Sequence, residues 1–256
     1  MSGLSVYKRM LAVRGEKGAG YCVLLDPDRK DKKSLVEMAR ECEDAGADAL
    51  LVGSSILYFS EFDALIQDLS QAVNVPVILF PGSGMQLSRH ADAVLFLSII
   101  SGRNPHYLIG EQVLAAPAIH AMDLEAISTA YMIVESGSMT SAEFMSNTTP
   151  LPRNKPDIAA AHALAARYLG FKWVYLEAGS GAEHSVPERL IEAVARVNLP
   201  VIVGGGIQTP EAAASKVEAG ASFIVTGNVL ERKGASAVKA FANAVHRTAP
   251  SGQGRS

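Results

Sequence analysis

The sequence predicts a single domain over residues 1–248 with the (β/α)8 barrel fold, the TIM barrel. Eight short apolar segments rich in β-branched residues alternate with amphipathic helical stretches along the chain. Most of these segments are apolar throughout, which is typical of parallel strands covered on both faces. The length of 256 residues also fits eight βα units, because such barrels take about 250 residues. A doubly wound sheet is the alternative, but it usually has fewer strands.

The order of elements follows from these patterns. The expected strands cover residues 21–25, 49–52, 77–80, 93–97, 130–134, 173–176, 201–203 and 223–225. The expected helices cover residues 32–45, 62–72, 107–120, 158–169, 188–196, 210–219 and 235–244. Thr209 and Pro210 are a helix cap and a first helical residue. Gly46, Gly170 and Gly220 each follow a helix and allow its left-handed end.

Three segments depart from a regular barrel. Val6, Met10 and Val13 are spaced like one helical face, which predicts a short extra helix at the N-terminus. Only residues 82–92 separate the third strand from the fourth, so the third helix is expected to be missing or shortened, leaving a groove. The long polar segment 136–156 follows the fifth strand and is expected to be a loop or lid on the catalytic face.

The composition argues against several classes of function. The formal net charge is −3 and aromatic residues make up 6% of the chain, so we expect no nucleic-acid partner. The longest apolar stretch, residues 91–100, is about half of a membrane span. Cys22 and Cys42 fall in apolar patterns, which indicates reduced core residues and a cytoplasmic protein. The tail 249–256 is rich in Gly and Ser and is expected to be disordered.

Glycines follow the last three strands, where barrel enzymes commonly bind phosphate. Their backbone N–H groups can converge on phosphate oxygens because no Cβ blocks the approach. The alternative is that these glycines only relieve tight turns between strand and helix. The residues concerned are Gly179, Ser180 and Gly181, then Gly205 and Gly206, then Gly227 and Asn228.

Acidic and hydroxyl side chains follow other strands. Asp26 and Ser54 end the first two strands, and their hard oxygens suit Mg²⁺; helix capping is the alternative for Asp26, although Asp31 is better placed for it. Glu177 ends the sixth strand, where it could accept a proton from a substrate hydroxyl or make a structural hydrogen bond. Tyr175 points the same way as Glu177, because side chains alternate along a strand.

With these motifs the chain resembles the geranylgeranylglyceryl phosphate synthase family. The matching motifs are Leu-Asp-Pro-Asp at 25–28, Val-Gly-Ser-Ser at 52–55, Ser-Gly-Arg-Asn-Pro at 101–105, Tyr-Leu-Glu-Ala-Gly-Ser-Gly at 175–181, Val-Gly-Gly-Gly-Ile at 203–207 and Thr-Gly-Asn at 226–228. Their order and spacing match over nearly the whole chain.

The resemblance implies a prenyltransferase that joins the C3 hydroxyl of sn-glycerol 1-phosphate to geranylgeranyl diphosphate and releases diphosphate. It implies Mg²⁺ at Asp26 and Ser54, and catalysis by Glu177 with Tyr175. The implied substrate residues run from Tyr175 through Leu176 and Ala178 to Gly181, with Gly205, Gly206, Gly227 and Asn228. The heptaprenyl members carry a lysine where this chain has Leu24, so the resemblance disfavours a heptaprenyl donor.

Two other functions remain open at this point. One is a different phosphate-binding barrel enzyme, an isomerase or synthase of amino-acid biosynthesis, for which Glu135 would be a second acid. The other is a non-catalytic barrel that binds phosphosugars, because function belongs to sites rather than folds. Barrels of this kind often associate through their outer helices, so we expect a homo-oligomer.

Overall fold

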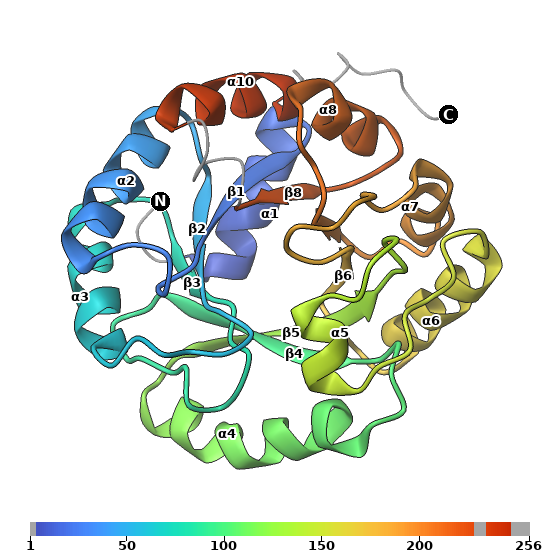
Figure 1. Ribbon diagram of the computed structural model, residues 1–256, viewed down its shortest axis with the longest axis horizontal. Coiled ribbons are helices and arrows are strands. Elements are labelled where there is room, and N and C mark those ends of the chain that lie inside the picture. Colours follow the sequence, from blue (N-terminus) through green and yellow to red (C-terminus); the bar gives the residue numbers. More distant parts are fainter. Residues whose placement is uncertain (1–3, 228–233, 247–256) are drawn as a thin grey trace.

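The computed structural model is a closed barrel of eight parallel strands in sequential order, with helices around it (Figure 1). It describes residues 4–227 and 234–246. The predicted tail 249–256 therefore lies outside the described residues. The strands are β1 (Gly20–Leu25), β2 (Ala49–Val52), β3 (Val77–Leu79), β4 (Ala93–Ile99), β5 (Glu125–Ile133), β6 (Trp173–Glu177), β7 (Val201–Gly204) and β8 (Phe223–Thr226).

All helices except α5 lie where the apolar periodicity predicts them. They are α1 (Val6–Lys17), α2 (Lys32–Asp44), α3 (Phe62–Ala72), α4 (Glu111–Ala121) with the preceding π-helical turn η1 (His106–Gly110), α5 (Ser141–Ser146), α6 (Pro156–Tyr168), α7 (Glu188–Ala195), α8 (Pro210–Glu218) and α10 (Ala235–Val245). Asp31 caps α2 through the Ser34 N–H, as predicted. Within the described residues, no helix is long and apolar enough to span a bilayer.

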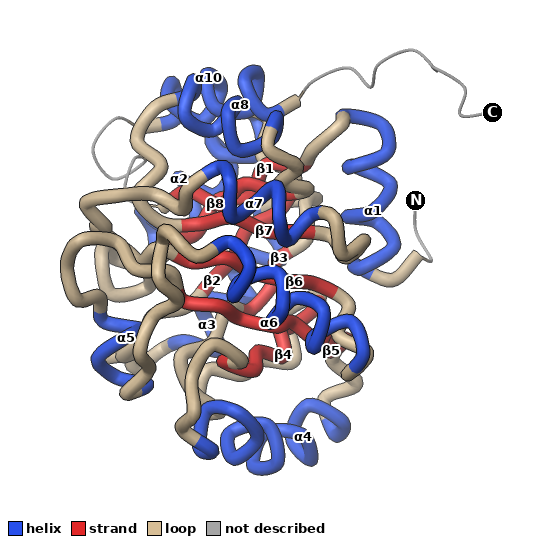
Figure 2. Tube along the Cα trace, turned by 90° about the vertical axis from the view of Figure 1, so that its right-hand side faces the viewer, coloured by secondary structure: helices blue, strands red, loops and turns tan. Residues whose placement is uncertain are grey.

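The barrel has two distinct ends. The extra helix α1 is confirmed, and it covers the end opposite to α5 and the long loops (Figure 2). Met10 of α1 is fully buried, and the Tyr7 ring lies 5.7 Å from the Trp173 ring at the start of β6. The carboxylate of Glu125 accepts the Val6 and Tyr7 N–H groups at the start of α1. This end is therefore closed, and a ligand must enter from the other end.

The missing third helix is confirmed as well. Residues 80–92 connect β3 to β4 through turns alone, all of them described. Two expectations need correction. The strand β5 starts at Glu125, five residues before its predicted start at residue 130, and pairs with β4 over seven residues. The segment 136–156 is not only a loop, because it contains α5, whose start is fixed by a capping box between Thr140 and Glu143.

Candidate active site

A cavity of about 650 Å³ opens among the carboxyl ends of the strands. Its polar part lies over β1, β2 and β6–β8, and an apolar arm runs between β4 and α4, beside the missing helix. The side chains that line this arm are Phe80, Leu87, Val94, Phe96, Leu97, Tyr107, Ala115 and Ile119. One continuous cavity therefore offers both a polar and an apolar environment.

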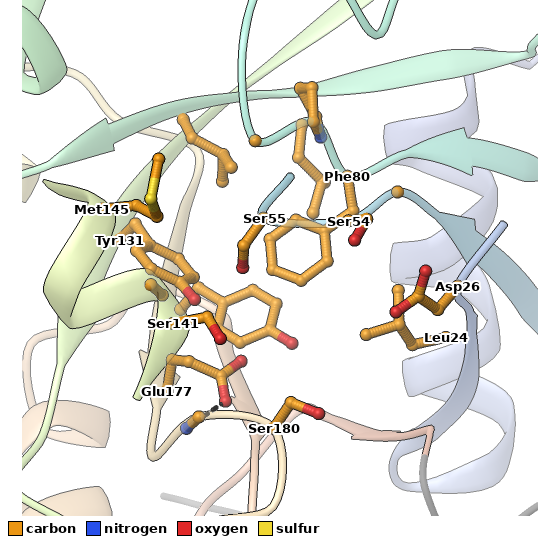
Figure 3. A pocket seen from close by; sticks show the side chains of 18 of the residues that line it. Leu24, Asp26, Ser54, Ser55, Phe80, Tyr131, Ser141, Met145, Glu177 and Ser180 are labelled. Atoms are coloured by element: carbon orange, nitrogen blue, oxygen red, sulfur yellow. Dashed lines mark hydrogen bonds between the residues drawn. The ribbon is translucent and has the colours of Figure 1, made fainter. Parts of the chain in front are cut away.

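Glu177 is the most unusual ionisable group in the cavity. Because side chains alternate along β6, Trp173, Tyr175 and Glu177 all point into the barrel, with Glu177 at the open end. Its Oε1 accepts the Gly179 N–H at 2.6 Å (Figure 3). Burial raises the pKa of Glu177 from 4.5 to about 7, although the Gly179 N–H bond and the nearby hydroxyls of Tyr175 and Tyr131 oppose the shift. This carboxyl can therefore change its protonation near neutral pH.

Two buried tyrosines face this carboxyl. Burial, reinforced by the Glu177 charge, raises the pKa of both Tyr131 and Tyr175, so both hydroxyls keep their protons. The Tyr175 ring stacks on Phe80 at 5.1 Å and lies 5.3 Å from the Tyr131 ring. The Tyr175 hydroxyl lowers the pKa of Glu177, but among the described residues its geometry does not form a hydrogen bond with any group. A buried hydroxyl without a partner is available to a ligand oxygen.

Tyr131 is absent from the sequence-based site. It lies in β5 opposite Tyr175 in the β5–β6 register, and only this pairing brings it to Glu177. An apolar strand with one inward tyrosine is a weak signal by itself, because such a residue is usually part of the core.

The predicted glycine loops meet at the polar part of the cavity. Gly179, Gly181, Gly205 and Gly206 have left-handed backbone conformations and line the cavity together with Ser180 and Gly227. A Cβ at Gly205 would collide with Glu177 Oε1 and with the Gly179 backbone. Gly205 is therefore needed so that the β7 loop can approach the Glu177 carboxyl. Asn228 lies outside the described residues.

Two predicted substrate residues lie on the other face of β6. Leu176 and Ala178 are fully buried in the core between the strands and the outer helices, and neither lines the cavity. The reason is the same alternation that turns Tyr175 and Glu177 inward. The Ala178 N–H is already bonded to the Gly204 carbonyl. The two side chains therefore cannot contact a ligand in this cavity.

Asp26 and Ser54 both line the cavity and lie across it from Glu177 (Figure 3). Asp26 Oδ1 accepts the Asp28 N–H at 3.0 Å, and Oδ2 lies 3.3 Å from Arg29 Nε. Across the described residues, no cluster of three or more His, Cys, Asp or Glu side chains suits a metal. A cation at Asp26 and Ser54 would therefore take most of its ligands from water and substrate.

Glu135, the second acid of the alternative barrel enzymes, is exposed and does not line the cavity. Its N–H and carbonyl bond Leu151 and Arg153, next to the bridge between Val134 and Leu151. The geometry therefore offers no second acid at this position.

Comparisons with known proteins agree with this arrangement. The sequence model of the PcrB family matches residues 11–245. A geranylgeranylglyceryl phosphate synthase of Chitinophaga pinensis is 42% identical over 246 residues, which cover 96% of this chain and 97% of that one. A synthase of the same name from Caldivirga maquilingensis is 44% identical, over 95% of this chain and 92% of that one.

A solved structure is also similar. The (S)-3-O-geranylgeranylglyceryl phosphate synthase of Thermoplasma acidophilum, in complex with its substrate sn-glycerol-1-phosphate, superposes with a TM-score of 0.90 at 35% identity. The match covers 95% of this chain and 99% of that one. Matches of this extent, at both the sequence and the structural level, place the chain in the PcrB family.

Proposed function

We propose that the chain is a geranylgeranylglyceryl phosphate synthase, a prenyltransferase that joins sn-glycerol 1-phosphate to geranylgeranyl diphosphate. The observation that carries the proposal is the position of Glu177. This carboxyl, with a pKa raised to about 7, lies where the glycine loops meet the rest of the cavity. The acceptor is supported by the substrate named for the Thermoplasma acidophilum structure.

The acceptor binds over β6–β8 in this proposal. Backbone N–H groups of the loops at Gly179–Gly181 and Gly205–Gly206 hold its phosphate, helped by the partial positive charge at helix N-termini. The Tyr175 hydroxyl, which has no hydrogen-bond partner in the described part of the chain, then orients the glycerol end. These contacts supply position rather than covalent chemistry.

Glu177 is the general base. It takes the proton from the C3 hydroxyl as the hydroxyl oxygen attacks C1 of the prenyl donor and the C1–O bond breaks. The diphosphate leaves with the bonding electrons of that C1–O bond. Because Oε1 is bonded to the Gly179 N–H, Oε2 is the atom left to receive the proton. The faces of Phe80 and Tyr175 provide π electrons near the positive charge that develops at C1.

The diphosphate end of the donor lies near Asp26 and Ser54. Their carboxylate and hydroxyl oxygens fit Mg²⁺, which typically takes one or two protein carboxylates and completes its shell with water and phosphate oxygens. Bound Mg²⁺ supplies positive charge that stabilises a diphosphate leaving group. Arg29, 3.3 Å from Asp26, holds that carboxylate in place.

The prenyl chain occupies the apolar arm between β4 and α4. Met145 of α5 also lines the cavity, so the segment 136–156 contributes to the walls of the substrate site. Leu24 lies beside Asp26 (Figure 3), where the resemblance places a lysine in heptaprenyl members. We propose a C20 donor on this basis. Self-association and a cytoplasmic location remain predictions.

The test is transfer of radiolabelled glycerol 1-phosphate into an organic phase, with Mg²⁺ and prenyl diphosphates of several lengths. We expect extractable label that depends on the prenyl diphosphate, with C20 the best donor. The Glu177→Gln variant is the control and should transfer little label. If label is never extracted with any donor while the protein binds glycerol phosphate, the non-catalytic alternative is favoured.

A further inference from the structure

The connection between β3 and β4 contains two enclosed polar side chains, Gln86 and Ser88. Gln86 is 2% exposed, although it lies in a segment of turns rather than in a helix or strand. Its Oε1 accepts the Ser54 N–H at 3.1 Å, and its Nε2 donates to the Ser54 carbonyl at 2.7 Å. One side chain thus bonds both backbone groups of Ser54, much as a neighbouring strand would.

The surrounding backbones are interlocked. A Cβ at Gly53 would collide with the Phe80 carbonyl, and a Cβ at Gly82 would collide with the carbonyl of Ser54. Glycine at both positions lets the β2 loop and the β3–β4 connection come close enough for Gln86 to reach Ser54. The position of the Ser54 backbone, from which its hydroxyl projects, therefore depends on a segment about thirty residues further along the chain.

We infer that Gln86 is a positioning residue for the diphosphate end of the prenyl donor. It holds Ser54 so that its hydroxyl faces the same part of the cavity as Asp26. The inference rests on the proposed function, because it takes Ser54 as part of the Mg²⁺–diphosphate site. The β3–β4 connection, which contains no helix, then contributes to both parts of the cavity. Phe80 and Leu87 line the apolar arm, and Gln86 holds Ser54 at the polar part.

The chain offers a matched control. Gln112 of α4 is also a buried glutamine at the cavity wall, 8% exposed, and its Nε2 donates to the carbonyls of Leu97 and Tyr107. These hydrogen bonds go to β4 and η1, not to the loop at Ser54. Replacing Gln112 by methionine removes a comparable pair of buried bonds without releasing Ser54.

The experiment measures binding of inorganic diphosphate with Mg²⁺ by calorimetry, and steady-state kinetics of the same preparations. Gln86→Met keeps the approximate volume and removes both hydrogen bonds. We expect diphosphate affinity to fall by about 10-fold, the loss typical of two net hydrogen bonds. The KM for the prenyl donor should rise by a similar factor while the KM for glycerol phosphate stays within twofold. Gln112→Met should lower the melting temperature but leave diphosphate binding unchanged.

Gln86→Glu serves as the second variant, because it retains an acceptor for the Ser54 N–H and carries the comparison where the methionine variant does not fold. Equal losses of diphosphate and glycerol phosphate binding would overturn the inference, since they indicate general destabilisation. It would also fail if Asp26→Asn weakened diphosphate binding and neither Gln86 variant did. If wild type bound no diphosphate with Mg²⁺, the inference would fail too, while label transfer would still decide the proposed function.

Discussion

Replacing Glu177 by Gln separates two effects of this carboxyl: the stability that the fold loses by burying it, and its contribution to kcat. The glutamine keeps the size and an acceptor for the Gly179 N–H, but it cannot take a proton at neutral pH. A general base contributes about 10²–10⁴-fold, so kcat should fall by at least about 10²-fold with substrate binding retained. In wild type, a pKa of about 7 means that kcat should rise with pH through neutrality, with about 10% of Glu177 ionised at pH 6 and about 90% at pH 8.

The same substitution should stabilise the fold at high pH. The folded pKa of Glu177, about 7, lies above its ordinary value of 4.5, so the folded state binds more protons between these values and stability falls as pH rises through them. The difference corresponds to about 3 kcal/mol at 1.36 kcal/mol per pKa unit. Glu177→Gln escapes this loss, so its melting temperature should exceed that of wild type by up to roughly 10 °C at pH 8.

The assay is thermal melting of both proteins at pH 5 and pH 8, together with kcat at pH 8. At pH 5 the wild-type carboxyl is protonated when folded, so the two melting temperatures should nearly coincide. A variant that melts lower than wild type at pH 8, with kcat per folded molecule unchanged, would refute the reasoning. That result would make Glu177 a structural residue.

Four further substitutions test other parts of the molecule. Asp26→Asn should raise the Mg²⁺ concentration for half-maximal activity about 10-fold or more without changing the circular dichroism spectrum; normal activity at limiting Mg²⁺ would remove Asp26 from the site. Gly205→Ala should lower both kcat and the melting temperature, because its Cβ would collide with Glu177 Oε1 at 2.3 Å. Gly227→Ala should have smaller effects on both, because the nearest atom to its Cβ is the Leu24 carbonyl oxygen at 3.3 Å; equal effects of the two on kcat would contradict the assignment. Asp48→Asn should lower the free energy of unfolding by about 2 kcal/mol at pH 7 and by much less near pH 3. Burial alone would raise the pKa of Asp48, but hydrogen bonds, chiefly from His246 and Lys17, hold it below its ordinary value, so its stabilisation is lost as pH falls through the folded pKa; urea unfolding at both pH values checks this.

The strands were predictable because both of their faces are covered. Seven of the eight expected strands lie within two residues of their observed ends, and each is an apolar run. The exception is β5. Glu125 and Ser128, near its start, are polar because each forms a hydrogen bond with another part of the fold. Glu125 caps α1, and Ser128 bonds the Lys172 N–H. These tasks depend on neighbours in space, so the local pattern does not reveal them.

The helix α5 had a local signal in the capping box of Thr140 and Glu143, which the polar composition of the segment obscured. In the site, consecutive residues of one motif can point to opposite faces of a strand, so not all of them reach the cavity. Leu176 and Ala178 share the motif of Glu177 but point into the outer core. Tyr131 and Gln86 are the converse case, because each reaches the site from another segment, by strand register or by a long-range hydrogen bond.

The missing helix connects the fold to the chemistry. In a regular barrel a helix after β3 would pack on the outer faces of β3 and β4, and Val94 and Phe96 would have no access to a cavity. Here both side chains line the apolar arm, with Ala115 and Ile119 of α4 as the facing wall. The carboxylate of Glu111 at the start of α4 accepts the Gly84 N–H at 2.8 Å. A polar contact thus joins α4 to the β3–β4 connection, where a regular barrel would have two packed helices. The proposed C20 donor would need such an opening beside the buried Glu177 carboxyl, because α1 fills the closed end of the barrel and helices cover the other strands.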